Sequence, residues 1–495
     1  MEGKHLADLA AAAGGEVRGA AWVTGVAYDS RRVRPGDLFC AVRGFRTDGH
    51  RYVADARARG AVAALVEDWE AVPADLPAIR VPNSRVAMAR VAAAFWDHPS
   101  RHLWTIGVTG TNGKTTTTHL IRTILEAGGI PTGLTGTVHT LVGAEEWPVE
   151  RTTPEAPDLQ ATLARMVERG MRAVVMEVSS HALALARVDG VLYDVGVFTN
   201  LTQDHLDFHA DFEAYFAAKA RLFERLPGSA QKGPVAAVLN ADDLWAGRLV
   251  GLTRAPVLTY GLGGTGDARA EDIRLEDTGT AFRAILPDGA AVPVRIPLAG
   301  RFNVANALAA LAVGHLAGIE PERMAAALAG MSGVPGRFER IDCGQPFAVV
   351  VDYAHSPDGI QNVLRAAREV TRGRVVAVFG AGGDRDRTKR PLMGRAAGAV
   401  ADLVVLTSDN PRSEDPLAIL ADIEAGVRET AAQYLVEPDR REAIRRAFAG
   451  AAPGDIVLIL GKGHETYQIF RDRTIHFDDR EVSREILGEQ GYRCR

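Results

Sequence analysis

The sequence is poor in cysteine, and its cysteines lie far apart. Cys40, Cys343 and Cys494 are the 3 cysteines of a chain of 495 residues. An odd number of cysteines at these spacings fits neither a disulfide framework nor a structural zinc site. We therefore expect no disulfide, and we expect a reducing cytoplasm as the setting.

The sequence also lacks a long apolar run. Its most apolar helical stretch, residues 306–317, is interrupted by Gly314 and His315. The stretch is shorter than the ~20 residues that cross a bilayer as a helix. The first residues carry the charged side chains Glu2 and Asp8, so they lack the apolar core of a signal peptide. We expect neither membrane insertion nor export.

An excess of positive charge is absent as well. Lys and Arg together number 57 and Asp and Glu number 62, which gives a formal net charge of -5 at pH 7. Such a balance provides no general field that attracts nucleic acid or an anionic membrane, although local basic clusters can still bind a phosphorylated small molecule. We expect small-molecule substrates, no nucleic-acid partner and a monomer.

What the sequence does contain is typical of a globular protein with several domains. Hydrophobic residues make up 47% and charged residues 24% of the chain, and at ~100–200 residues per domain the length predicts about three domains. The segments DHPS at 97–100 and GVPG at 333–336 indicate boundaries, because the residue before a proline is disfavoured in a helix. The predicted domains are residues 1–98, 99–335 and 336–495.

Short apolar runs alternate with helical stretches through the second and third predicted domains. The runs are residues 104–109, 173–178, 195–199, 235–239, 347–351, 375–379, 403–406 and 456–460. This alternation is typical of parallel strands that are buried under crossover helices, so we predict the α/β fold class. Each run ends at a polar or glycine-rich segment, which is where open α/β sheets bind ligands.

A glycine-rich turn follows the first of these runs. Residues 105–116 read TIGVTGTNGKTT and lead from a predicted strand into a helix predicted to begin near Thr115. Glycines allow close backbone approach, so successive N–H groups can surround a phosphate at the start of a helix. Lys114 would supply a positive charge to the β- and γ-phosphates, and Thr115 a hydroxyl to Mg²⁺.

This loop is a variant of the phosphate-binding pattern. Val108 stands where G-x-x-x-x-G-K-[ST] requires its first glycine. A plain turn with an exposed lysine is the alternative, which the preceding strand and the Lys-Thr pair disfavour. A phosphate loop alone does not identify an enzyme, because motors, switches and kinases share it.

Several segments resemble motifs of the Mur ligase family, and they occur in the family's order. They are GTNGKTT at 110–116, EVSSH at 177–181, NLTQDHLD at 200–207, AAK at 217–219, RFNVAN at 301–306, PGRFE at 335–339 and DYAH at 352–355. The resemblance covers nearly the whole chain. It implies an N-terminal uridine-binding α/β domain, a central P-loop ATPase domain with a mostly parallel sheet, and a C-terminal Rossmann-like domain that binds the amino acid.

The resemblance implies ATP contacts at the positions that match the family's motifs. They are Gly110, Thr111, Asn112, Gly113, Lys114, Thr115 and Thr116 in the loop, Asn303 and Asn306 for adenine and ribose, and Arg337 for the γ-phosphate. The two asparagines stand three apart at the predicted start of a helix, so both amides can face one side. Helix capping is the alternative role for them.

A catalytic group and a metal site are implied in the same way. The implied catalytic residues are Lys114, Glu177, His205, Lys219, Asp352 and His355. Thr115 and Glu177 would hold one Mg²⁺, and Glu177, His205 and Lys219 a second. In most of these ligases the lysine carries a CO₂-derived carbamate (N6-carboxylysine), which turns a cation into an oxygen ligand suited to Mg²⁺. Zinc at His205 and His209 is the alternative, but the glutamate of HExxH is absent, and Lys219 by itself would be a solvated lysine.

The resemblance further implies two groups of contacts to a UDP-N-acetylmuramoyl dipeptide. They are Ser30, Phe45, Arg46 and Thr47 in the first domain, and Thr152, Thr153, Ser179 and Arg187 in the second. The chain departs from the family at Leu185, where a glutamine is common, and at Arg151, where an asparagine commonly precedes the threonine pair. A turn at Asp29 and Ser30 without a binding role is the alternative for Ser30.

The segment SDNPR at 408–412 resembles the signature of family members that add diaminopimelate. The second carboxylate of meso-diaminopimelate can be held by a guanidinium through paired charged hydrogen bonds. The implied contacts are Arg385, Asp409, Asn410, Pro411, Arg412, Gly461 and Glu465. An Asn-Pro turn without a binding role is the alternative.

The implied reaction is amide ligation in cytoplasmic peptidoglycan precursor synthesis. The D-glutamyl γ-carboxylate of UDP-N-acetylmuramoyl-L-alanyl-D-glutamate would attack the γ-phosphate of ATP, and the amine of meso-2,6-diaminopimelate would attack the acyl phosphate. Such catalysis rests on positioning and electrostatics. A lysine-adding ligase, a folylpolyglutamate synthetase-like ligase and a nucleotide-binding regulator stay open as alternatives.

Overall fold

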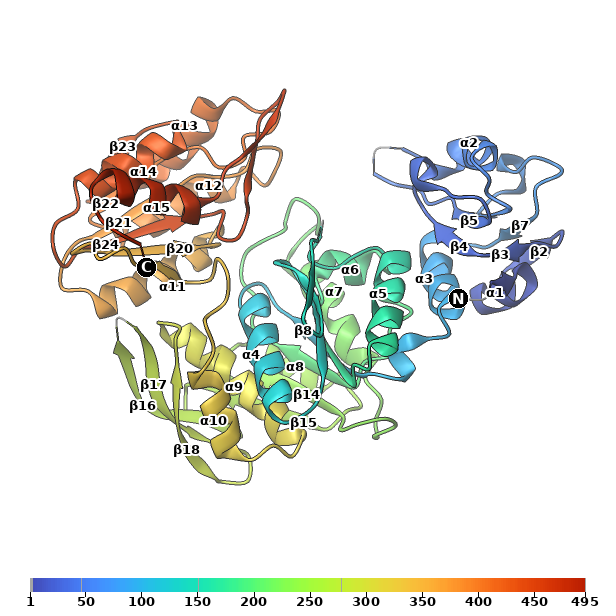
Figure 1. Cartoon of the computed structure of the whole chain (residues 1–495), viewed down its shortest axis with the longest axis horizontal. Coiled ribbons are helices and arrows are strands. Elements are labelled where there is room, and N and C mark those ends of the chain that lie inside the picture. The colour runs from blue at the N-terminus through green and yellow to red at the C-terminus, as the bar shows by residue number, and fades with distance from the viewer. Residues whose placement is uncertain (1–2, 46, 150, 277, 495) are drawn as a thin grey trace.

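The computed structural model describes residues 3–45, 47–149, 151–276 and 278–494. Three α/β units follow one another along the chain, each around a main sheet of its own (Figure 1). In Figure 1 the N-terminal unit lies at the upper right in blue, the central unit below in cyan to yellow, and the C-terminal unit at the upper left in orange to red. The boundaries predicted after residues 98 and 335 stay a prediction.

The N-terminal unit is a five-stranded sheet with helices packed against it. Its strands in spatial order are β2 (Glu16–Arg18), β7 (Ala78–Arg80), β6 (Ala63–Val66), β5 (Asp37–Cys40) and β4 (Gly25–Ala27). Two further strands, β1 (Lys4–His5) and β3 (Trp22–Val23), form a separate pair. Its helices are α1 (Leu6–Ala13), α2 (Val53–Ala58) and α3 (Ser84–Phe95). Strands β4 to β7 are parallel, and only β2 runs antiparallel to its neighbour.

The central unit is an 11-stranded sheet. Its strands in spatial order are β11 (Glu145–Trp147), β10 (Thr140–Val142), β9 (Thr132–Thr135), β12 (Ala173–Glu177), β8 (Trp104–Thr109), β13 (Val195–Phe198), β14 (Ala236–Asn240), β15 (Val257–Gly261), β16 (Ala268–Glu276), β17 (Gly279–Ile285) and β18 (Ala291–Ile296). Pairing is parallel from β9 to β16 and antiparallel at both ends.

Helices cover both faces of the central sheet. On one face lie α4 (Lys114–Ala127), α9 (Arg301–Leu316) and α10 (Pro321–Ala329), and on the other lie α5 (Ala156–Glu168), α6 (Ser180–Ala184), α7 (Phe212–Glu224) and α8 (Ala246–Val250). Side chains of β12 alternate between these two cores, Val175 toward the first and Val174 and Met176 toward the second. Burial on both faces explains why this strand is apolar throughout.

The C-terminal unit is a 6-stranded sheet that is parallel except at one edge. Its strands in spatial order are β19 (Glu339–Ile341), β20 (Ala348–Asp352), β24 (Ile456–Leu460), β21 (Val375–Phe379), β22 (Leu403–Leu406) and β23 (Gln433–Val436). Its helices are α11 (Pro357–Val370), α12 (Lys389–Gly398) and α13 (Pro416–Val427) on one face, and α14 (Arg440–Ala449) and α15 (Asp479–Glu489) on the other. A hairpin of β25 (Tyr467–Ile469) and β26 (Thr474–His476) completes it.

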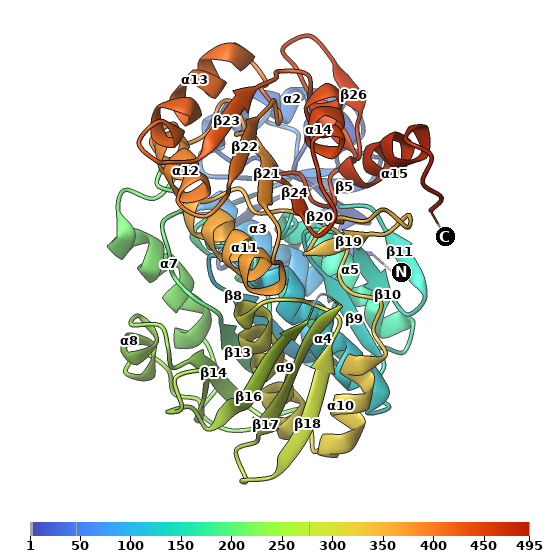
Figure 2. The ribbon, with the colours of Figure 1, turned by 90° about the vertical axis from the view of Figure 1, so that its left-hand side faces the viewer.

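The predicted α/β class and the predicted apolar strands are confirmed. Strands β8, β21, β22 and β24 have the predicted bounds. β12 and β13 end one residue before the predicted ends, and β14 and β20 are shifted by one residue along the chain. The antiparallel strands β16 to β18 were not predicted. In Figure 2 they form a meander below the C-terminal unit. Their alternating exposed and buried residues give no continuous apolar run.

The expectation of no disulfide is wrong. Cys343 and Cys494, 151 residues apart in sequence, form a disulfide, while Cys40 is buried and free. The last helix, α15, packs beside β19, so the chain end returns to the segment after that strand. The spacing of cysteines along a chain does not reveal this proximity, because it depends on tertiary packing. The cysteine pattern therefore gives no indication of a reducing compartment.

None of the helices in the described part of the chain combines the length and the apolar character that crossing a bilayer requires.

A hinge segment, residues 330–338, connects α10 to β19. Within it, the oxygen of Gly336 accepts a hydrogen bond from Tyr353 N at 3.0 Å, and its N–H donates to Glu339 Oε2 at 2.8 Å. A Cβ on Gly336 would lie 2.1 Å from His464 N. The hinge is therefore packed tightly against the loop that follows β24.

Replacing Gly336 by alanine is expected to destabilise the protein more than replacing Gly333. Both glycines have a positive φ, 66° and 92°, so alanine costs about 1 kcal/mol at either position. Only at Gly336 does the new Cβ meet other atoms; at Gly333 no described atom lies within 4 Å. Overpacking adds about 1–3 kcal/mol. The melting temperature should fall further for Gly336→Ala, and an equal fall would contradict the close packing of the hinge.

Candidate functional site

The phosphate loop lies at the carboxyl end of β8, as the sequence predicts. Its glycines have positive φ, 152° at Gly110 and 86° at Gly113. A Cβ on Gly110 would lie 1.8 Å from Thr199 Oγ1, so only glycine fits there. Helix α4 begins at Lys114, which places free N–H groups and the positive end of the helix at the loop. This geometry suits a phosphate chain.

Two lysines donate to the loop from opposite sides. Lys114 Nζ donates to the oxygens of Gly110 at 3.0 Å and Thr111 at 2.9 Å. Lys219 Nζ, on α7, also donates to Gly110 O at 2.7 Å and lies 4.5 Å from the centre of the Tyr215 ring. Lys219 is only 1% exposed. Burial, and then the charge of Lys114, lower the pKa of Lys219 well below its usual value.

Glu177 ends β12 beside the loop. Its carboxylate accepts hydrogen bonds from Thr137 N at 2.7 Å and Thr137 Oγ1 at 2.9 Å. A Cβ on Gly136 would lie 2.3 Å from Glu177 Oε1, so the segment after β9 fits closely against this carboxylate. Thr137 was not identified from the sequence, although it orients a predicted metal ligand.

A buried carboxylate, Asp204, lies beside two histidines and a lysine that come from two units. Asp204 Oδ2 lies 3.6 Å from His205 Nε2 and 3.9 Å from His355 Nε2, and Asp204 Oδ1 lies 3.6 Å from Lys389 Nζ. Burial would raise the pKa of Asp204, but His205, Lys389 and His355 lower it. Burial also lowers the pKa of His205, which favours the neutral imidazole that metals coordinate.

Arg337 links the hinge to the phosphate loop. Its Nη2 donates to Thr115 Oγ1 at 2.8 Å, and its guanidinium lies 4.7 Å from the centre of the Tyr353 ring. A second link joins Asn112 Nδ2 to Asp358 Oδ2 at 2.9 Å. The C-terminal unit therefore already touches the loop. Asp352 accepts from Phe338 N and Ala354 N at 2.6 and 2.7 Å, which ties the hinge to β20.

Both predicted asparagines lie in the first turns of α9 and face the phosphate loop. Asn306 Oδ1 accepts from Thr117 Oγ1 at 3.2 Å, and Asn306 Nδ2 donates to Asn303 Oδ1 at 3.2 Å. Asn303 Nδ2 donates to Ala299 O at 2.8 Å. Gly300, and neither asparagine, is the N-cap of α9, so the capping alternative is wrong.

The predicted ATP and amino-acid residues line two cavities that meet. A cavity of about 610 Å³ is lined by the phosphate loop, Glu177, Asn303 and Asn306. One of about 1120 Å³ is lined by Asp409, Asn410, Arg412, Gly461 and Glu465. Residues that line both are Thr137, Arg151, Thr152, His181, Asp204, His205, Tyr353, His355 and Arg385. The two cavities therefore form one cleft between the central and C-terminal units.

The larger cavity is lined by both acidic and basic side chains. Asn410 Nδ2 donates to Glu465 Oε2 at 2.9 Å, and Lys462 Nζ, which was not predicted, lies 3.1 Å from the same oxygen. Burial, and then Asp409, raise the pKa of Glu465. Arg412 Nη1 donates to Gly383 O at 2.9 Å. Carboxylates and guanidiniums on one wall complement a ligand that bears both ammonium and carboxylate groups.

Pro411 lies behind this wall and packs against Gly383. It is absent from the residues that line the described cavities, but a Cβ on Gly383 would lie 1.9 Å from Pro411 O. The loop that carries Arg385 thus packs directly on the segment that carries Arg412.

The predicted contacts to the UDP substrate fall into two separate groups. Thr152, Thr153, Ser179 and Arg187 line the smaller cavity. In the N-terminal unit, Ser30 begins a short 3₁₀ helix, Thr47 Oγ1 lies 3.1 Å from Tyr52 Oη, and Phe45 is 77% exposed. Arg46 lies outside the described residues. The ring of Phe45 lies 5.8 Å from that of Phe208, so this side chain contacts the central unit.

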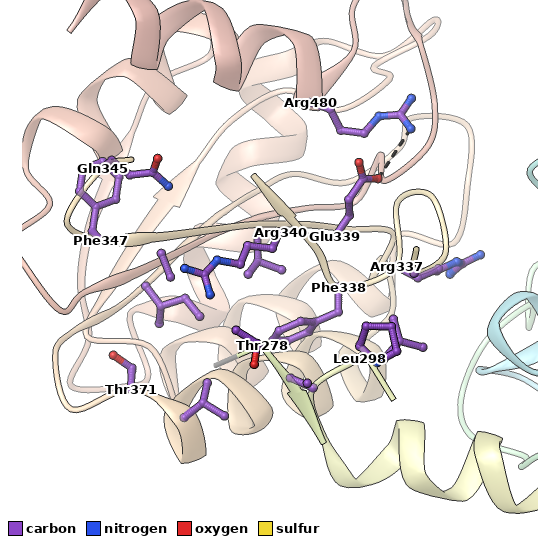
Figure 3. Close-up of a pocket in the computed structure, with 18 of the residues that line it drawn as sticks. Thr278, Leu298, Arg337, Phe338, Glu339, Arg340, Gln345, Phe347, Thr371 and Arg480 are labelled. Atoms are coloured by element: carbon purple, nitrogen blue, oxygen red, sulfur yellow. Dashed lines mark ion pairs between the residues drawn. The ribbon is translucent and has the colours of Figure 1, made fainter. Parts of the chain in front are cut away.

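A third cavity, of about 630 Å³, lies on the other side of the hinge segment (Figure 3). The ends of β17 and β18, the segment after β19 and the C-terminal end of α11 line it. Phe338 and Arg340 extend toward its interior, and Glu339 and Arg480 form an ion pair at 3.7 Å on its border. Arg337 lines this cavity and the smaller part of the cleft. Of the predicted site residues that the structure describes, only Arg337 belongs to it.

Family models match three parts of the chain. The model described as "Mur ligase family, catalytic domain" matches residues 23–96, "Mur ligase middle domain" matches 108–314, and "Mur ligase, glutamate ligase domain" matches 336–463. The chain belongs to the Mur ligase family. The "UDP-N-acetylmuramoyl-L-alanyl-D-glutamate--2,6-diaminopimelate ligase" of Solibacter usitatus is 50% identical over 472 residues, with 95% of this chain and 94% of the relative covered.

Other Mur ligases agree with this assignment. The protein of the same name from Geobacillus kaustophilus is 49% identical, with 95% of this chain and 96% of the relative covered. The "UDP-N-acetylmuramyl-tripeptide synthetase" of a Roseiflexus species is 49% identical, with 95% of each chain covered. A solved structure of a 2,6-diaminopimelate ligase of the family has a TM-score of 0.66 and 34% identity, with 95% of this chain and 96% of that chain covered. The predicted Mur ligase fold with three domains is therefore confirmed.

Proposed function

We propose that this Mur ligase adds meso-2,6-diaminopimelate to the D-glutamyl γ-carboxylate of UDP-N-acetylmuramoyl-L-alanyl-D-glutamate with consumption of ATP. The reaction belongs to cytoplasmic peptidoglycan precursor synthesis, and we propose that the enzyme works as a monomer. The observation that carries the proposal is the single cleft in which a phosphate loop and a wall with both guanidinium and carboxylate groups meet. The names of relatives at 49–50% identity support the choice of substrates.

The described donors around the loop fit Mg²⁺. Thr115 offers a hydroxyl and Glu177 a carboxylate, and both are hard oxygen ligands. His205 and a carbamylated Lys219 would complete a second position. Bound Mg²⁺ would neutralise charge on the phosphate oxygens. Thr137 holds the Glu177 carboxylate by two hydrogen bonds, which orients a ligand that the ion needs.

Activation of the substrate carboxylate brings two anions together, so the protein must supply cations there. Lys114 and Arg337 meet this need from the central unit and the hinge. The γ-carboxylate attacks the γ-phosphate, ADP leaves, and an acyl phosphate forms. The amine of diaminopimelate then attacks the acyl carbon, and phosphate leaves as the amide forms. Closure of the C-terminal unit excludes water, which would otherwise hydrolyse the acyl phosphate.

Recognition of the amino acid is assigned to the larger part of the cleft. Arg385 and Arg412 would bind the distal carboxylate, and Asp409 and Glu465 the ammonium group beside it. Lysine has no distal carboxylate, so it would not form the proposed charged hydrogen bonds with Arg385 and Arg412. A lysine-adding ligase is therefore disfavoured.

A substrate panel tests the function directly. Phosphate release is expected only when the UDP-dipeptide, meso-diaminopimelate, ATP and Mg²⁺ are all present, with the UDP-tripeptide identified by mass. Loss of one buried charged pairing predicts at least about 100-fold lower kcat/KM for L-lysine. Ligation of glutamate to a folate would instead favour the folylpolyglutamate synthetase alternative. ATP binding without any ligation would favour a regulator.

A further inference from the structure

A carboxylate at the start of α5 gathers three guanidinium groups from three segments. Glu155 is the N-cap of α5 and is 7% exposed. Its Oε1 pairs with Arg151 Nη1 and lies 2.9 Å from Arg187 Nε, and its Oε2 lies 3.6 Å from Arg85 Nη1. No motif of the sequence analysis includes Glu155 or Arg85. The cluster borders the cleft, because Arg151 and Arg187 line the smaller cavity.

The charges in this cluster do not balance. Three guanidiniums against one carboxylate leave an excess of two positive charges at a half-buried place. The nearby acid Asp158 is engaged by Tyr28 Oη at 2.5 Å. Within the described structure, Arg187 Nε is buried and makes no hydrogen bond, although Glu155 Oε1 lies 2.9 Å away. Buried charge without full pairing is unfavourable, so an additional anion from the cleft would stabilise the cluster.

The same cluster connects the cleft to the N-terminal unit. Arg85 belongs to α3, and its Nη2 donates to Arg43 O at 3.5 Å. Arg43 in turn pairs with Asp48 across the loop that carries Phe45. Helices α3 and α5 pack together at Ala89, Ala92 and Ala156 (Figure 1). A chain of polar contacts therefore runs from the Phe45 loop to the residues that border the cleft.

We propose that Glu155 is a positioning residue that aims Arg151 and Arg187 at a carboxylate of the dipeptide end of the UDP substrate. Through Arg85 it couples this orientation to the docking of the N-terminal unit. The inference rests on the proposed function and deepens it. Arg151, which departs from the family's pattern, then acts as a second guanidinium for the substrate carboxylate.

The test is the variant Glu155→Gln, which keeps the shape and removes the charge. Its KM for UDP-N-acetylmuramoyl-L-alanyl-D-glutamate is expected to rise about 10-fold, because a buried pairing with a charged group is weakened. KM values for ATP and meso-diaminopimelate should stay within about 2-fold, because those ligands bind elsewhere in the cleft. Binding of UDP-N-acetylmuramate should weaken less than binding of the UDP-dipeptide, because it has no dipeptide carboxylate for Arg151 and Arg187. Glu155→Asp should recover part of the loss.

Two further variants keep the test decisive. Asp455→Asn removes a buried carboxylate that pairs with Arg374 in the C-terminal unit; it should lower the melting temperature and leave every KM unchanged. Arg85→Met should raise the KM for the UDP-dipeptide in the folded protein, and it should add little to Glu155→Gln if the two residues act together. If the increases in KM of the two single variants multiply in the double variant, the coupling is overturned.

The outcomes separate this inference from the proposed function. Wild-type protein that forms no UDP-tripeptide would remove the proposed function, and direct binding of the UDP-dipeptide would still report on Glu155. Active wild type with an unchanged KM in Glu155→Gln would overturn the inference alone. Equal weakening of UDP-dipeptide and UDP-N-acetylmuramate binding would also overturn it, because the effect would then not concern the dipeptide.

Discussion

Replacing Arg412 by alanine should reduce kcat/KM for meso-diaminopimelate about 100-fold, because charge-assisted hydrogen bonds to a buried carboxylate are lost. The KM for ATP should stay within about 2-fold, since the proposed ATP site is at the other end of the cleft. L-lysine has no distal carboxylate, so its slow turnover should change little. The preference for diaminopimelate over lysine would therefore nearly vanish. Steady-state ADP formation with each amino acid measures all of these effects.

The control is Arg471, which donates to Ser413 O from the neighbouring hairpin segment. Arg471→Ala removes a guanidinium that lies beside the Arg412 loop but does not line the cleft. It should leave kcat/KM for diaminopimelate within about 2-fold of wild type. Equal losses for ATP and diaminopimelate in Arg412→Ala would contradict a role in selecting the amino acid, and would assign Arg412 to holding the Gly383 loop instead.

Replacing Lys219 by alanine should reduce kcat at least about 1000-fold, because the site would lose a ligand for metal that stabilises the transferring phosphate. Burial beside Lys114 lowers the pKa of Lys219, which favours the neutral amine. Only a neutral amine reacts with CO₂, so the environment favours formation of the carbamate. An unmodified ammonium at this place would repel Mg²⁺.

A short carboxylate such as acetate or formate should partly restore the activity of Lys219→Ala, because it would replace the oxygen ligands of the proposed carbamate. Lys232 provides the matched control. It is a partly buried lysine of the central unit whose Nζ lies 2.6 Å from Asp194 Oδ2, and it does not line the cleft. Lys232→Ala should lower the melting temperature, keep most of kcat and show no response to added carboxylate. Wild-type activity in Lys219→Ala would remove this residue from the site.

The core of the fold could be predicted because its strands are buried on both faces. Strand β8 and its parallel neighbours form continuous apolar runs that end at polar loops, and both features are visible in sequence. The meander of β16 to β18 escaped prediction because one of its faces is exposed. The disulfide escaped because Cys343 and Cys494 meet only through the return of the chain end.

The site residues that could be predicted belong to continuous sequence motifs. The phosphate loop is one continuous segment, and the segment at 408–412 is another. Asp204 and Lys389 were missed because their proximity arises between units that are far apart in sequence. Glu155 was missed because, by itself, an acidic residue after a proline indicates only the start of a helix.

The hinge segment is a common wall, with the catalytic cleft on one side and the separate cavity of Figure 3 on the other. Arg337 belongs to both spaces. A rotation of the C-terminal unit about the hinge segment would change the shape of both spaces, because Arg337 and Phe338 line both. A ligand that made the cavity of Figure 3 rigid would therefore slow turnover without contacting a reacting atom.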